Sequence, residues 1–202
     1  MQKVAVFVDF ANVNRAADDQ RLRIDYSHLL NEYLVNRDEG RALQAASIYV
    51  PINPRNEHGR DAVIKDLWKA GFIVKSKVGT IAGDSYKCNF DIEMVMDVMK
   101  AVYEIKPDVL ILASGDVDFV PMVLELRNLG IFVEVAGFSN STSSLLIERA
   151  NSFIDLKIYY DEYCGEGDVQ YYIEDENDNP NPENDSDNDQ HSEDHFNLPG
   201  QN

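Results

Sequence analysis

Short apolar runs alternate with stretches of helical periodicity along the first 160 residues. Runs of five or six residues, rich in Val, Ile, Leu and Phe, predict buried strands over 4–8, 45–50, 72–77, 109–113 and 132–136. Apolar residues at three- and four-residue spacing predict helices over 25–34, 58–70, 91–103, 119–129 and 143–150. We expect Trp68 on the core-facing side of its helix, a loop over 78–89 and an edge strand over 153–158.

Alternation of strands and helices defines the fold class. It predicts an α/β domain in which a mainly parallel sheet carries helices on both faces. Right-handed crossovers favour a doubly wound order in which the strand at 4–8 lies beside the strand at 109–113. In such folds the ligand site lies at the carboxyl ends of the strands, where the direction of winding reverses.

Charge divides the chain into two parts. Residues 161–202 contain 14 of the 36 acidic residues and no Lys or Arg, so residues 1–160 carry 22 acidic against 18 basic residues. We predict a folded domain over 1–160 and a disordered acidic tail over 161–202, since the tail has too few apolar residues to offset the entropy of ordering. We favour a role for the tail in solubility. The alternative is that it mimics nucleic acid and competes for the basic residues of the domain.

Targeting signals are not evident. The first apolar run, 4–8, is shorter than a signal-peptide core, and no run approaches the roughly 18 residues that cross a membrane. Cys88 and Cys164 have no metal-ligand spacing. The sequence therefore predicts a reduced, cytoplasmic protein with no membrane partner.

Carboxylates cluster around the segment LILASGDVDFVPMV at 110–123. Asp116 and Asp118 follow one predicted strand, and Asp9 follows the strand expected beside it. Asp91 opens a predicted helix and can supply a fourth acid. Crowded carboxylates repel one another, so a cation is expected among them. Hard oxygen ligands suit Mg²⁺ or Mn²⁺, and such a metal can polarise a phosphate and help generate a hydroxide.

Each acid also has a structural interpretation. Asp118 and Asp91 suit helix N-termini, and Asp9 suits a turn. Glu93 and Asp97 do not share a helical face with Asp91, which argues against a joint ligand role.

Substrate-binding candidates lie close to these acids. Asn12 and Ser114 can bind a metal-bound water or a substrate phosphate, and Lys87 precedes Asp91 by four residues. A hydroxyl such as that of Ser114 also commonly stabilises a loop. Further basic residues are expected around this face, where they could hold a phosphate backbone or form ordinary surface charge: Arg15, Arg21, Arg23, Arg55, Arg60, Lys75 and Lys77.

Four segments resemble the NYN domain family, the LabA-like branch of the PIN-like nucleases. They are VFVDFANV at 6–13, DIEMVMDVM at 91–99, LILASGDVDFVPMVLELRNLGIFVEVAG at 110–137 and SSLLIERANSFIDL at 143–156. The resemblance implies a three-layer α/β/α Rossmann-like domain of the PIN type with an acidic divalent-metal site. Its motifs match Asp9, Asn12, Asp91, Asp97, Ser114, Asp116 and Asp118 in this sequence.

The resemblance also implies RNA chemistry. The leading hypothesis is a Mg²⁺- or Mn²⁺-dependent ribonuclease in which Asp9, Asp91, Asp116 and Asp118 are catalytic and metal-binding. The alternative is an RNA-binding or regulatory scaffold with little catalysis, which the weak basicity of the domain favours. A phosphatase of the haloacid-dehalogenase type is disfavoured because Asp9 is followed by Phe10 and Ala11 rather than a second acid. A homodimer, and a protein partner bound through the tail, remain open.

Overall fold

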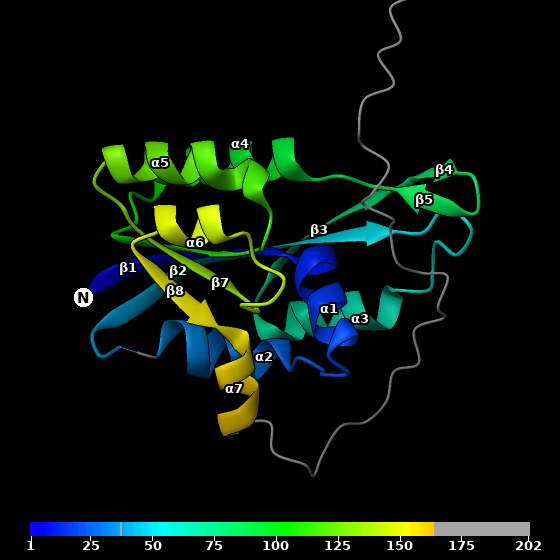
Figure 1. The fold of residues 1–202 in the computed structure, drawn as a ribbon, viewed down its shortest axis with the longest axis horizontal. Helices are drawn as coiled ribbons and strands as arrows, with labels where there is room; N and C mark the ends of the chain where they lie inside the picture. The colour runs from blue at the N-terminus through cyan, green and yellow to red at the C-terminus, as the bar shows by residue number, and fades with distance from the viewer. Residues whose placement is uncertain (37, 164–202) are drawn as a thin grey trace, which may run out of the picture.

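A six-stranded parallel sheet forms the centre of the molecule, with strand order β3-β2-β1-β6-β7-β8. A separate antiparallel hairpin, β4–β5, extends from one end of it (Figure 1). The structure is a computed structural model and describes residues 1–36 and 38–163. The predicted order is confirmed, because β1 pairs with β6.

The strands and helices have the following bounds. The strands are β1 Gln2–Asp9, β2 Arg41–Ile52, β3 Ile73–Val78, β4 Thr80–Ala82, β5 Ser85–Lys87, β6 Val109–Ala113, β7 Phe132–Gly137 and β8 Ser152–Asp155. The helices are α1 Phe10–Asp19, α2 Tyr26–His28, the π-helix η1 Leu29–Val35, α3 Asp61–Ala70, α4 Asp91–Glu104, the 3₁₀ helix η2 Val117–Phe119, α5 Val120–Asn128, α6 Ser144–Arg149 and α7 Leu156–Tyr163.

Two central strands explain why the apolar runs predicted the sheet correctly. Residues 4–8 of β1 and all of β6 are almost wholly buried. A strand buried on both faces needs apolar side chains at every position rather than at alternate ones. Continuous apolar runs therefore mark the middle of this sheet.

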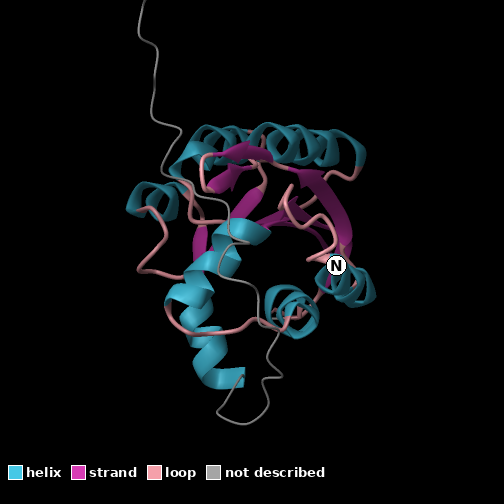
Figure 2. Ribbon diagram, turned by 90° about the vertical axis from the view of Figure 1, so that its right-hand side faces the viewer, coloured by secondary structure: helices cyan, strands magenta, loops and turns pink. Residues whose placement is uncertain are grey.

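Helices cover both faces of the sheet, as the three-layer prediction requires (Figure 2). One face packs against α1, α2, η1, α3 and α7, around a core that includes Val4, Val6 and Val8. The other packs against α4, η2, α5 and α6, around a core that includes Ala5 and Phe7. The alternation of β1 side chains between the two cores follows from the two-residue period of a strand.

Two segments differ from the sequence-based expectation. No element was predicted over 10–19, where α1 forms, because its core-facing side contains two alanines beside Phe10 and Val13 and gives a weak apolar signal. The expected loop over 78–89 contains the β4–β5 hairpin. Its strands have only three residues each and are partly polar, so they lack the period of a buried strand.

Trp68 was predicted in the core, but 60% of its surface is exposed. The core-facing side of α3 contains Ile64 and Leu67 instead. The edge strand expected over 153–158 is shorter, since α7 begins at Leu156. Most of the predicted tail lies outside the described residues, so the boundary near residue 160 remains a prediction.

A buried ion pair crosses the sheet near the amino ends of its strands. Arg41 of β2 donates to both carboxylate oxygens of Glu134 of β7, at 2.8 and 3.2 Å, and both side chains are 5% exposed. Asp38 contacts the same guanidinium. The pair fixes strands that are not neighbours in the sheet.

None of the helices within residues 1–36 and 38–163 has both the length and the apolar character needed to cross a bilayer.

Candidate metal centre

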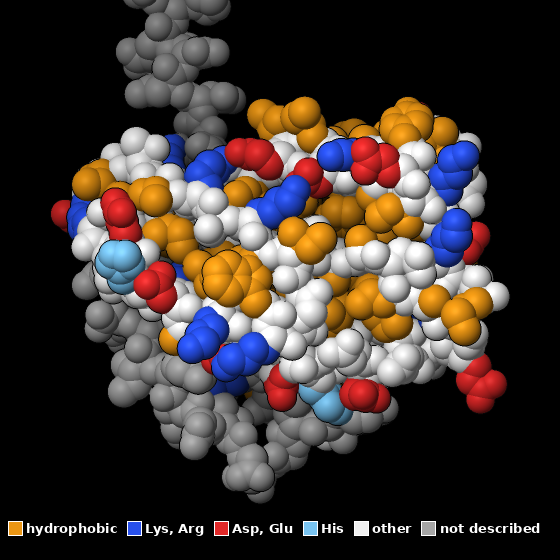
Figure 3. Space-filling view, turned by 180° about the vertical axis from the view of Figure 1, so that it is seen from behind, with side chains coloured by type: hydrophobic (Ala, Val, Ile, Leu, Met, Phe, Trp, Pro, Cys, Tyr) orange, Lys and Arg blue, Asp and Glu red, His pale blue; other side chains and the backbone are white. Residues whose placement is uncertain are grey.

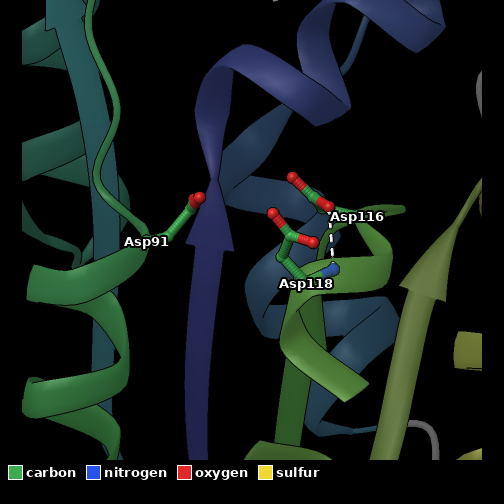
Figure 4. Close-up of side chains that lie close together, drawn as sticks. All are labelled: Asp91, Asp116 and Asp118. Atoms are coloured by element: carbon green, nitrogen blue, oxygen red, sulfur yellow. Dashed lines mark hydrogen bonds between the residues drawn. The ribbon is translucent and has the colours of Figure 1, made fainter. Parts of the chain in front are cut away.

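Three carboxylates converge beyond the carboxyl ends of β1 and β6. Asp91 is the first residue of α4, and Asp116 and Asp118 lie at the start of η2, directly after β6. Figure 4 shows the Asp91 side chain pointing from α4 toward the two η2 acids. α4 and η2 pack around the same core on one face of the sheet, which brings Asp91 close to Asp116 and Asp118 although the residues are distant in sequence.

The spacing of these acids fits a divalent cation. One carboxylate oxygen from each of Asp91, Asp116 and Asp118 lies within 4.8 Å of the others. Around Mg²⁺, with bonds of about 2.1 Å, opposite ligands lie about 4.2 Å apart. Asp118 is exposed, so a small movement of its side chain is enough to bring all three oxygens within that distance. The donor set consists of hard oxygens, which suits Mg²⁺ or Mn²⁺.

Asp9 ends β1 and adjoins this cluster. Its Oδ1 accepts the backbone N–H of Asn12 at 3.1 Å, which caps α1. Burial, followed by the nearby charges of Asp91 and Asp116, raises the pKa of Asp9 from 3.8 to about 6, against the opposing hydrogen bonds from Asn12 and Ser114. Burial is the main cause of the raised pKa, and the contributions of Asp91 and Asp116 show that neighbouring acids add to it.

Hydrogen bonds to Asp9 and Asn12, at the start of α1, hold the segment Ser114–Gly115–Asp116. The Asn12 side chain accepts the Gly115 N–H at 2.7 Å, and the Ser114 hydroxyl donates to Asp9 at 3.4 Å and accepts the Asp116 N–H at 3.3 Å. A Cβ at Gly115 would lie 2.7 Å from the Ser141 carbonyl oxygen. Asn12 and Ser114 therefore position the acidic loop, whereas their predicted substrate-binding role remains a prediction.

Asp91 is oriented by a residue that the sequence analysis missed. Asn89 accepts the Asp91 backbone N–H at 2.6 Å and donates its own side-chain N–H to the Asp91 carboxylate at 2.8 Å. An Asn side chain often accepts the backbone N–H two residues further along the chain. Asn89 was therefore the sequence signal that could have predicted this contact with Asp91.

A second network explains why Asp97 does not join the cluster. Asp97 accepts hydrogen bonds from the buried Tyr49 hydroxyl, at 2.7 Å, and from Lys75. Burial opposes ionisation, but these two donors lower the pKa of Asp97. Asp9, Tyr49 and Lys75 stand side by side in the sheet register. These three neighbouring residues connect the carboxyl end of β1 to Asp97 on α4.

Two of the predicted basic residues near the site make ion pairs within the chain. Lys75 pairs with Asp97, and Lys77 pairs with Glu93 and lies 4.8 Å from the centre of the Phe90 ring. Much of their charge is therefore compensated locally.

Two others belong to the hairpin region. Arg55 donates to the carbonyls of residues 83, 84 and 85 at the hairpin tip. Lys87 is half-buried in β5, four residues before Asp91, and its role in binding substrate remains a prediction.

The order of the strands and the position of the acids define a class of protein. This is a doubly wound α/β domain with an acidic site, suited to a divalent cation, where the winding reverses. The NYN domain matches residues 3–157, and the chain belongs to the NYN domain family.

This chain is similar to two known proteins. The Low amplitude and bright protein LabA of Synechococcus elongatus is 27% identical over 162 residues, an alignment that covers 76% of this chain and 83% of the relative. A protein of unknown function from Vibrio parahaemolyticus has a crystal structure with a TM-score of 0.64 and 25% identity. That match covers 77% of this chain and 93% of the Vibrio chain.

Proposed function

We propose that this protein is a metal-dependent ribonuclease that cleaves RNA phosphodiester bonds. One observation carries the proposal: Asp91, Asp116 and Asp118 present oxygens within 4.8 Å of one another at the point of the fold where ligands bind. Membership of the NYN domain family, whose PIN-like relatives are nucleases, supports it.

The four acids divide into two kinds. Asp91, Asp116 and Asp118 would hold a Mg²⁺ or Mn²⁺ ion, which supplies polarisation of a phosphate and activation of water. Asp9 lies deeper, with one oxygen committed to capping α1. Its second oxygen accepts from Ser114, so Asp9 would add negative charge to the site and fix the loop that carries Asp116.

The alternative is an RNA-binding scaffold without catalysis that uses the same face of the domain. The ion pairs of Lys75 and Lys77 give it less support, because they leave less positive charge for binding phosphates. Binding that persists in EDTA, with no cleavage in any metal, would select this candidate.

The deciding experiment is cleavage of end-labelled single-stranded RNA by the full chain in Mg²⁺, Mn²⁺ or EDTA. The variant is Asp116→Asn, which keeps an oxygen able to accept the Asp118 N–H now bound at 2.9 Å. The matched control is Asp66→Asn on α3, which removes an exposed charge paired with Lys69. Single-stranded DNA of the same sequence and an RNA duplex define the substrate class.

We expect metal-stimulated RNA cleavage that EDTA abolishes. Asp116→Asn should reduce the rate at least 100-fold, while Asp66→Asn leaves it within about twofold, since exposed pairs contribute little to stability. Wild-type activity in Asp116→Asn, or cleavage unaffected by EDTA, would refute the metal-dependent assignment.

A further inference from the structure

The outward face of α4 carries apolar side chains where a helix on a sheet normally carries polar ones. The residues that pack on the sheet are Met94, Val98 and Ala101. On the opposite side, Ile92 is 74% exposed, Met96 66% and Tyr103 70%. Hydrophobic side chains are exposed along the upper edge of the molecule in Figure 3, where α4 lies. Single exposed apolar residues are ordinary, but these share one face of one helix.

The spacing of these residues is that of a coiled-coil seam. Ile92, Met96, Met99 and Tyr103 follow one another at intervals of four, three and four, which is the alternation of d and a positions in a heptad repeat. Met99 is partly buried and packs against the core, and the other three are the exposed residues above. The seam from Ile92 to Tyr103 is about 17 Å long, at 1.5 Å per residue.

We infer that α4 is a self-association surface, on which a second copy of this chain packs its own α4 in antiparallel orientation. A two-fold axis at the middle of the helix would place Ile92 against the partner copy's Tyr103, and Met96 against its Met99. Self-complementarity of this kind is what an isologous dimer requires.

The charged residues beside the seam favour a second copy of this chain bound in antiparallel orientation. Glu93 and Lys100 occupy the positions that flank the seam on one side, and antiparallel pairing brings each against the opposite charge on the other copy. A parallel pair would instead set Lys100 against Val95. Within its own chain Glu93 pairs with Lys77, and Lys100 lies 3.8 Å from Glu104. All four of these side chains are exposed, so the intermolecular pair competes with weak surface contacts.

The size of the surface sets the expected strength. A contact confined mainly to one 14-residue helix is at the small end of specific interfaces, which begin near 1,200 Å² of total buried surface. We therefore expect a reversible dimer with a dissociation constant of about 1–100 μM, the range of transient contacts. This inference is independent of the proposed function, since no seam residue is one of the site acids.

The test is sedimentation equilibrium of the full chain at concentrations from about 0.3 to about 300 μM, which brackets the expected dissociation constant. Met96→Glu places a charge in the seam and should weaken the dimer at least 30-fold. Ile158→Glu on α7 is the matched control, because Ile158 is also an exposed apolar residue (51%) and α7 lies far from α4 (Figure 1). The control should dimerise like the wild type, and circular dichroism should show both variants folded.

A charge exchange tests the orientation. Lys100→Glu alone should weaken the dimer, because it sets two acids against one another, and adding Glu93→Lys should restore most of the affinity. A wild-type chain that stays monomeric throughout the concentration range overturns the inference. So does a dimer that Met96→Glu leaves intact, or a double variant no tighter than Lys100→Glu.

Discussion

The unfavourable environment of Asp9 has a consequence for stability that can be measured without any substrate. In the metal-free protein, burial and the charges of Asp91 and Asp116 raise the pKa of this carboxyl from 3.8 to about 6. Such a change corresponds to about 3 kcal/mol at neutral pH. Asp9 is only partly buried by its solvent-accessible surface area. Solvent screening therefore reduces the expected destabilisation to about 1–3 kcal/mol.

The sign follows from the direction of the change in pKa. A carboxyl whose folded pKa is raised adds most to stability below its unfolded pKa of 3.8 and loses that contribution as pH rises through about 6. Asp9→Asn removes the charge and keeps an oxygen able to cap α1. The variant should therefore be more stable than the metal-free wild type at pH 7.5, and this advantage should shrink by about two-thirds at pH 4.5.

Urea unfolding of both proteins in EDTA, at pH 7.5 and pH 4.5, measures the effect, with Asp66→Asn as the control for a surface charge. In thermal unfolding at pH 7.5, the melting temperature of Asp9→Asn should be about 3–10 °C above that of the wild type. Excess Mg²⁺ should stabilise the wild type more than Asp9→Asn, since a bound cation compensates the carboxylate. An advantage equal at both pH values, or an Asp9→Asn variant less stable than the wild type at pH 7.5, would refute the argument.

Two further predictions concern tight packing around the sheet. Gly115→Ala should cost about 1–3 kcal/mol in urea unfolding, because its Cβ would meet the Ser141 carbonyl oxygen at 2.7 Å; isothermal titration should also show weaker Mn²⁺ binding, and wild-type values in both would contradict the close approach. Glu134→Ala should cost about 3 kcal/mol, since it leaves the buried Arg41 guanidinium with Asp38 as its acidic partner. Glu134→Gln keeps the shape and should cost less; equal losses would show that the charge of Glu134 does not matter.

The part of the fold that was predictable is the part made of buried strands. β1 and β6 are apolar at successive positions because helices cover both of their faces, and the doubly wound order follows from connection rules rather than from residue detail. Once those two strands are neighbours, Asp9 and Asp116 must end at the same edge. The closeness of Asp9 to Asp116 therefore followed from the sequence, whereas the position of Asp91 depends on how α4 packs on the sheet.

Features that depend on register were not predictable in the same way. Tyr49 lies beside Asp9 of β1 and Lys75 of β3 because β2 pairs with both strands in one particular register. No local sequence pattern predicts that register. Trp68 looked like a core residue because it is apolar and close in sequence to Leu67. A difference of one residue rotates a side chain by about 100° around a helix, and this rotation separates the buried residue from the exposed one.

The pairing of β1 with β6 also governs when the acidic cluster can form during synthesis of the chain. β1 is made before both of its neighbours in the sheet, and one of them, β6, follows only after α4 has been completed. Chains grow from the N-terminus, and non-local parallel pairing forms slowly. A nascent chain that ends before Asp116 therefore lacks two of the three clustered acids. Completion of the acidic cluster thus waits until both α4 and β6 have been made.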